Sequence, residues 1–137
     1  MIVFNYLAAT GTLGGIDTGA VSDKYATRIT PAGYAFAIWS LIYLGCIAFS
    51  IYQALPKNAE RLRSFRRIYI LSCVANCAWL YFWHQEAILA CLGIIIILLA
   101  TVALINVKLK NTESLADFWL MKFPFGIYFC WVTAATI

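Results

Sequence analysis

The side chain in this sequence that is best placed to do chemistry is Asn76, an amide in the middle of an apolar stretch. It lies within residues 68–85, which contain no charged residue. An amide without a hydrogen bond in apolar surroundings costs about 1–3 kcal/mol, so Asn76 is expected to face a partner helix, a ligand or water. Trp79 and Trp83 follow at i+3 and i+7 and share its helix face. Either a helix–helix hydrogen bond or a ligand-binding site explains this face, and polarity alone does not separate the two.

Two further segments carry aromatic stripes with residues at i, i+3 and i+7. The stripes are Phe36-Trp39-Tyr43 and Tyr128-Trp131-Ala135. Stripes of this kind usually pack in a core, and Trp and Tyr near helix ends usually anchor a membrane interface. Three stripes with a buried amide among them also suit a flat polyaromatic or sterol-like ligand, stacked between rings and held by few polar contacts.

We therefore predict one cavity that is closed by the connection of residues 16–30. Its predicted lining residues are Trp39, Tyr43, Asn76, Trp131 and Ala135. In such a cavity, Asn76 is expected to select ligands that carry a carbonyl or carboxylate group, because its amide would otherwise lose a hydrogen bond.

The histidine and the cysteines of the sequence give little indication of a catalytic or metal site. The single histidine, His84, lies near Glu86 and could form a proton-relay pair, but a solvated turn at the membrane edge is the preferred interpretation. The cysteines are scattered through apolar stretches, at Cys46, Cys73, Cys77, Cys91 and Cys130. Without a second cluster or partnering histidines they predict buried thiols and no metal site. Paired carboxylates, phosphate loops and nucleophile elbows are absent from the sequence, and we expect that the protein requires no cofactor.

The segments that carry these residues are long and free of charge. Residues 29–56, 68–85 and 87–107 contain no charged residue, and residues 118–137 contain only Lys122. About 20 helical residues cross a hydrocarbon core of roughly 30 Å. Hydrophobic residues make up 64% of the chain and charged residues 12%. Continuous apolar runs favour helices over a barrel, so the sequence predicts an all-α, multi-pass integral membrane protein.

We expect a bundle of five transmembrane helices that forms a single domain over residues 1–137. The expected helices are residues 1–15, 32–54, 66–83, 87–107 and 118–137. The first and last are expected to be partial spans, which makes the domain incomplete. Helices three and four are expected to be antiparallel neighbours because their link is so short. Pro124 and Gly126 are expected to kink the last helix or to widen its first turn.

The basic residues predict the topology. Five of them lie between Lys57 and Arg67, and Lys108 and Lys110 follow two crossings later, on the same side. In membrane proteins the loops that face the cytoplasm carry an excess of Lys and Arg, so the connection from Lys57 to Arg67 is predicted to be cytoplasmic. This placement favours contact with the lipid bilayer, including anionic lipid, over nucleic acid as the reason for the net charge of +4.

Three segments resemble the translocator protein family, also called tryptophan-rich sensory proteins (TspO/MBR). Residues 30–43, TPAGYAFAIWSLIY, resemble the family's motif at the start of its second helix. Asn76-Cys-Ala-Trp79 resembles its Asn-x-x-Trp motif in the third helix, and residues 128–135, YFCWVTAA, resemble its Tyr-x-x-Trp-x-x-x-Ala motif in the fifth. The three motifs occur in the family's order on a five-helix plan.

This resemblance implies a tight five-helix bundle, often a homodimer, with a pocket near the loop between helices one and two. It implies an aromatic-lined site for porphyrin, haem, sterols or similar flat hydrophobic ligands, as in a receptor or carrier. By position, the implied ligand-binding residues are Phe36, Trp39, Tyr43, Asn76, Trp79, Tyr128, Trp131 and Ala135. A porphyrin-degrading side activity, reported for some family members, would involve Trp39 and Trp131.

Two other classes of function remain open from the sequence. A small secondary transporter would need inverted repeats and broken helices, and the sequence contains no internal repeat. A structural subunit of a larger membrane complex would bind no small ligand at all. Ligand titration separates the last class from a receptor, and solute flux in liposomes tests the transporter.

Overall fold

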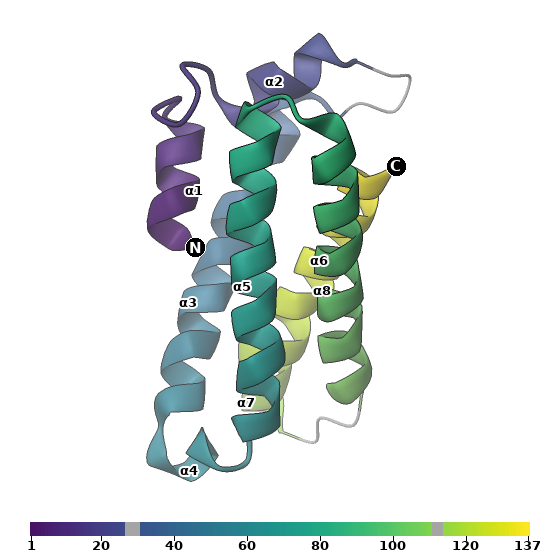
Figure 1. Ribbon diagram of the computed structural model, residues 1–137. Coiled ribbons are helices and arrows are strands. Elements are labelled where there is room, and N and C mark those ends of the chain that lie inside the picture. Colours follow the sequence, from purple (N-terminus) through teal and green to yellow (C-terminus); the bar gives the residue numbers. More distant parts are fainter. Residues whose placement is uncertain (27–30, 111–113) are drawn as a thin grey trace.

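The computed structural model describes residues 1–26, 31–110 and 114–137, and every regular element in these ranges is helical. The elements are α1 (Ile2–Ala9), α2 (Thr18–Lys24), the 3₁₀ helix η1 (Gly33–Ala37), α3 (Ile38–Ala54), α4 (Pro56–Ala59), α5 (Arg63–His84), α6 (Ile88–Lys108), α7 (Leu115–Asp117), the π-helical turn η2 (Phe118–Lys122) and α8 (Phe123–Thr136). Figure 1 shows α3, α5, α6 and α8 as long rods, with α1 beside one half of the bundle and α2 across its end.

Three rods in the described ranges are long and apolar enough to cross a membrane. They are Gly33–Ala54, Ile88–Lys108 and Leu115–Thr136, of 22, 21 and 22 residues. The 22-residue helix α5 is as long but carries more polar and aromatic side chains. These features confirm the predicted helical membrane bundle.

The two terminal helices differ from one another in length. Helix α1 has eight residues and rises about 12 Å. The last rod, Leu115–Thr136, has 22 residues, and its rise of about 33 Å matches a hydrocarbon core. Helix formation in this rod begins at Leu115, three residues before the predicted start at Phe118.

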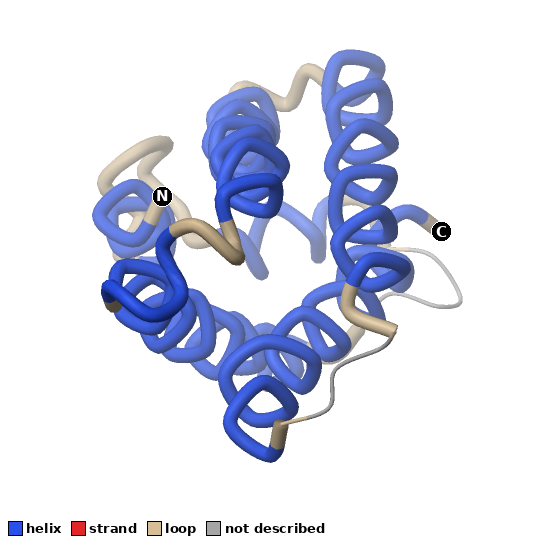
Figure 2. Tube along the Cα trace, turned by 90° about the horizontal axis from the view of Figure 1, so that it is seen from below, coloured by secondary structure: helices blue, strands red, loops and turns tan. Residues whose placement is uncertain are grey.

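The core runs along the inward faces of the rods, which surround a common axis in Figure 2. An aromatic triad fills the half of the core that lies away from α2: Phe49 lies 5.0 Å from both Tyr69 and Phe125, measured between ring centroids, and all three contacts are edge-to-face. Edge-to-face contacts place the positive ring edge on the negative ring face. The triad joins α3, α5 and α8 at one level of the bundle.

Helices α5 and α6 are antiparallel neighbours, as their short link predicts. The turn between them is closed by a hydrogen bond of 3.1 Å from the Ala87 amide to the Phe82 carbonyl. Glu86 adopts φ +56°, a left-handed conformation that reverses the chain within a few residues.

The α3–α8 contact depends on a glycine. A Cβ atom added to Gly45 would lie 2.5 Å from Cβ and 3.0 Å from Cγ of Pro124. The proline follows the π-helical turn η2, which is the widened first turn predicted for this region, since a proline cannot donate to the turn before it. The missing side chain of Gly45 lets the proline ring lie directly against α3.

A polar cluster ties the connections together at the end of the bundle that carries α4. The guanidinium of Arg61 binds both carboxylate oxygens of Asp117, at 2.8 Å and 2.7 Å. Tyr52 donates to the same carboxylate at 2.8 Å, and Asn58 accepts from Arg61 at 3.1 Å. The cluster thus links the end of α3, the α4–α5 connection and α7.

Candidate functional site

Trp39 is the centre of an aromatic cluster near the end of the bundle that α2 covers. Its ring stacks on Tyr43 at 5.4 Å and 16°, and lies 6.3 Å from Trp79. The rings of Tyr128 and Trp131 meet it edge-on, at 6.0 Å and 6.2 Å. The three stripes predicted from the sequence therefore converge on one indole, supplied by α3.

A cavity of about 410 Å³ lies between this cluster and helices α1 and α2. Its lining residues are Ile2, Asn5, Tyr6, Ala9, Asp17, Thr18, Gly19, Phe36, Ala37, Trp39, Ser40, Tyr43 and Leu80. Its volume falls within the roughly 300–1,000 Å³ of typical ligand sites. Most of the wall is apolar or aromatic, and a few polar groups interrupt it, which is the composition expected of a site for a hydrophobic ligand.

A second cavity of about 150 Å³ adjoins the first and shares Phe36 and Trp39 with it. Trp79, Trp131 and Ala135 line this smaller cavity. The single cavity predicted from the sequence is thus two cavities in the structure, because the Trp39 ring, held by its aromatic neighbours, stands between them.

Asn76 does not line either of these two cavities, in contrast to the prediction. It is fully buried, and its Oδ1 accepts a hydrogen bond of 2.8 Å from Nδ2 of Asn5. Asn5 also donates to the Met1 carbonyl at 2.9 Å and accepts a hydrogen bond from the Tyr43 hydroxyl. A helix–helix hydrogen bond between α5 and α1 therefore satisfies Oδ1 of Asn76, while its Nδ2 has no partner in the described part of the chain.

Asn5 is one of several cavity residues that were not predicted from the sequence. It lines the larger cavity, is 5% exposed, and connects α1, α3 and α5 through its amide. The signal was present, since Asn5 is an amide in an apolar stretch, as Asn76 is. The two amides satisfy each other, which is the common solution for polar side chains between membrane helices.

Helix α2 covers the cavities and is fastened to the α5–α6 turn. Asp17 caps α2 by accepting hydrogen bonds from the amides of Gly19 and Ala20, at 2.8 Å and 3.0 Å. Trp83 donates from Nε1 to the Thr18 carbonyl at 3.3 Å. The predicted closure by residues 16–30 thus holds for α2, whereas residues 27–30 lie outside the described residues.

Glu86 completes this fastening. Its carboxylate forms an ion pair of 2.5 Å with Lys24 and accepts a hydrogen bond of 2.7 Å from the Tyr25 hydroxyl. The hydrogen bonds from Lys24 and Tyr25 hold the pKa of Glu86 below its usual range. The same contact raises the pKa of Tyr25, because its hydroxyl donates to a carboxylate.

His84 takes no part in a relay with Glu86. Its Nδ1 lies 2.9 Å from the Leu80 carbonyl of its own helix, and the side chain is buried against Gly14. The prediction of a solvated turn was therefore wrong for His84, because the α1–α2 connection packs over the end of α5. Glu86 is exposed, as the prediction requires.

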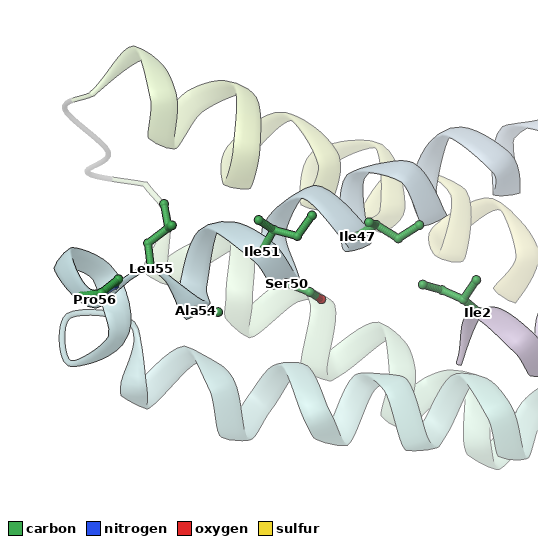
Figure 3. A pocket seen from close by; sticks show the side chains of 7 residues that line it. All are labelled: Ile2, Ile47, Ser50, Ile51, Ala54, Leu55 and Pro56. Atoms are coloured by element: carbon green, nitrogen blue, oxygen red, sulfur yellow. The ribbon is translucent and has the colours of Figure 1, made fainter.

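A groove of about 530 Å³ lies on the outer face of α3, away from the aromatic cluster. Figure 3 shows its side chains along α3, with Ile2 of α1 at one end. Its one side-chain hydroxyl, on Ser50, donates to the Cys46 carbonyl at 2.7 Å. The groove is thus an apolar outer surface without convergent polar groups, and the aromatic cavity is the better candidate site.

Comparison with known proteins agrees with this architecture. The model of the family described as TSPO-like protein matches residues 1–137. No curated protein and no solved structure matches the chain. The match extends over the apolar rods, the stripe residues on α3 and α8, and the Asn76-x-x-Trp79 segment on α5. The chain belongs to the TSPO-like protein family.

Proposed function

We propose that this membrane protein is a receptor or carrier that binds flat hydrophobic ring compounds in the larger aromatic cavity. Tetrapyrroles such as porphyrin and haem, and sterols, are the proposed ligand classes. The observation that carries the proposal is the position of Trp39, whose indole forms part of the wall of both cavities. An indole face offers a large apolar area to a stacked ring at little conformational cost.

The two adjoining cavities supply the space for such a ligand. Their shared wall consists of Phe36 and Trp39, and the Phe36 ring meets Trp131 edge-on at 5.6 Å. A ring compound in the larger cavity would contact Trp39 and Tyr43 on one side and α1 on the other. Burying aromatic surface in this way contributes about 25 cal/mol per Å².

Binding is tested by titrating the protein in nanodiscs with protoporphyrin and, separately, with cholesterol, and by following tryptophan fluorescence. Saturable quenching that exceeds the partition signal of empty nanodiscs supports the proposal. A response identical to that of empty nanodiscs for both ligand classes would contradict it and favour a structural subunit.

The Asn5–Asn76 pair gives a first mutational prediction. Asn76→Leu removes the acceptor that fixes Asn5 in the cavity wall, and we expect ligand affinity to fall by about 1–2 kcal/mol, the range of one buried hydrogen bond. The control is Asn106→Leu, which removes an amide bound to the Phe125 carbonyl at 2.9 Å, away from both cavities. Equal affinity losses in the two variants would show that the effect is not local to the site.

We also propose that the connection from Lys57 to Arg67 faces the cytoplasm, since Lys and Arg collect on that side. Figure 1 places α4 at the end of the bundle opposite α2, so single cysteines at the two ends report opposite sides. An impermeant thiol reagent added to intact cells is expected to label Gln85→Cys but not Glu60→Cys, both at exposed positions. The reverse pattern would invert the topology, and the unsubstituted protein gives the background from its own cysteines.

A further inference from the structure

The described lining of the larger cavity carries one charged side chain, and its charge is negative. Asp17 is its one carboxylate, and none of the described lining residues is Lys, Arg or His. The described lining of the smaller cavity contains no charged residue at all. A carboxylate on a ligand would therefore meet no compensating cation among these residues.

The nearest basic side chain on α2 is already paired. Lys24 Nζ lies 2.5 Å from Oε1 of Glu86, and this ion pair holds the end of α2 to the α5–α6 turn. Recruiting Lys24 to a ligand would break that fastening. It is therefore not available to a ligand carboxylate while α2 covers the cavity.

Three of the polar side chains that line the cavity, Asp17, Asn5 and Tyr43, offer a ligand no free donor, whereas Tyr6, Thr18 and Ser40 carry hydroxyls that can donate or accept. Both hydrogen bonds that Asp17 accepts from described residues reach Oδ1, which leaves Oδ2 without a donor there. Both amide hydrogens of Asn5 are used, by Met1 and Asn76, so its remaining capacity is an Oδ1 lone pair. The Tyr43 hydroxyl gives its hydrogen to the same Oδ1.

We propose that the larger cavity selects ring compounds that are uncharged or cationic and carry a hydrogen-bond donor, and that Asp17 disfavours carboxylate-bearing ones. This inference rests on the proposed function and narrows its ligand class: protoporphyrin and haem carry free carboxylates, so the cavity would prefer sterols and tetrapyrroles whose carboxylates are esterified or absent. A ligand carboxylate near Asp17 would bring two like charges together in a partly apolar site, where their repulsion is stronger than in water. A sterol hydroxyl would instead supply the donor that Oδ2 lacks among the described residues. The selection differs from the preference for carbonyl or carboxylate ligands expected from Asn76, because Asn5 stands between Asn76 and the cavity.

The test uses two matched pairs of probes that differ in charge. Protoporphyrin is compared with its dimethyl ester, and cholesteryl hemisuccinate with cholesterol, by tryptophan quenching in nanodiscs of zwitterionic lipid. For at least one pair the neutral member is expected to bind about tenfold more tightly, a repulsion slightly stronger than that of two like charges about 4 Å apart in bulk water. At about 1 M salt, where the Debye length is about 3 Å, the difference should shrink.

The variant Asp17→Asn tests whether Asp17 causes the difference in affinity between the neutral and the carboxylate-bearing probes. Asparagine caps a helix about as well as aspartate, so α2 should stay in place while the charge is removed. In this variant the two members of each pair are expected to bind within about twofold of one another. The control is Asp23→Asn, a carboxylate on the same helix that lies outside the lining of both cavities, and it should leave the difference unchanged.

The outcomes separate this inference from the function on which it rests. Equal binding of both members of each pair, tighter binding of the carboxylates, or a difference that Asp17→Asn does not change would overturn the charge selection and leave ring binding intact. Binding of neither pair would overturn the proposed function and the charge selection with it.

Discussion

Arg61→Ala is expected to lower the free energy of unfolding by about 3 kcal/mol, the lower end of the range for a broken buried ion pair. The side chain of Asp117 is 6% exposed, whereas that of Arg61 is 48% exposed. Removing Arg61 leaves an almost buried carboxylate whose remaining side-chain donor among the described residues is Tyr52, at 2.8 Å. The lower end of the range applies because water reaches half of the guanidinium. Denaturant unfolding in detergent micelles, followed by circular dichroism, measures the loss.

Two further variants test this mechanism. Arg63→Ala removes an exposed partner of Glu60 at 3.8 Å and should change the stability by less than about 0.5 kcal/mol. Adding Asp117→Asn to Arg61→Ala should recover part of the loss, because a neutral amide does not need the cation. A cost below about 1 kcal/mol for Arg61→Ala, or no recovery in the double variant, would mean that the Arg61–Asp117 pair does not hold the connections together.

Gly45→Val is expected to lower the stability by about 3 kcal/mol, through overpacking between α3 and α8. The first added atom would lie 2.5 Å from Cβ of Pro124 and 3.4 Å from its Cα. A proline ring has no rotamer that moves it aside, so the helices themselves must separate. Unfolding in micelles gives the magnitude, and Gly45→Ala should lie between the valine variant and the parent protein.

The matched control is Gly93→Ala on α6. A Cβ atom at Gly93 meets nothing within 4 Å, so alanine should leave the stability unchanged or raise it by up to about 1 kcal/mol through helix propensity. If Gly45→Val unfolds at the same denaturant concentration as the parent protein, α3 and α8 do not approach as closely as the structure shows.

The sequence by itself determined the membrane class, the long helices and the antiparallel α5–α6 pair. These features follow from local properties: a charge-free run must satisfy its backbone as a helix in lipid, and a link of a few residues leaves two helices side by side. Helical spacing also placed Trp39, Trp79 and Trp131 on inward faces, and the structure brings them together.

Only the tertiary structure decided which polar groups meet. Asn5 and Asn76 are 71 positions apart, Lys24 and Glu86 are 62 apart, and Arg61 and Asp117 are 56 apart. No periodicity within one helix identifies such partners, because each pair depends on the relative height and rotation of two rods. The same placement put Asn5 in front of Asn76 and the Trp39 ring between two cavities. A pattern on a single helix shows that a buried amide needs a partner, and only the packing of the helices shows which partner it has.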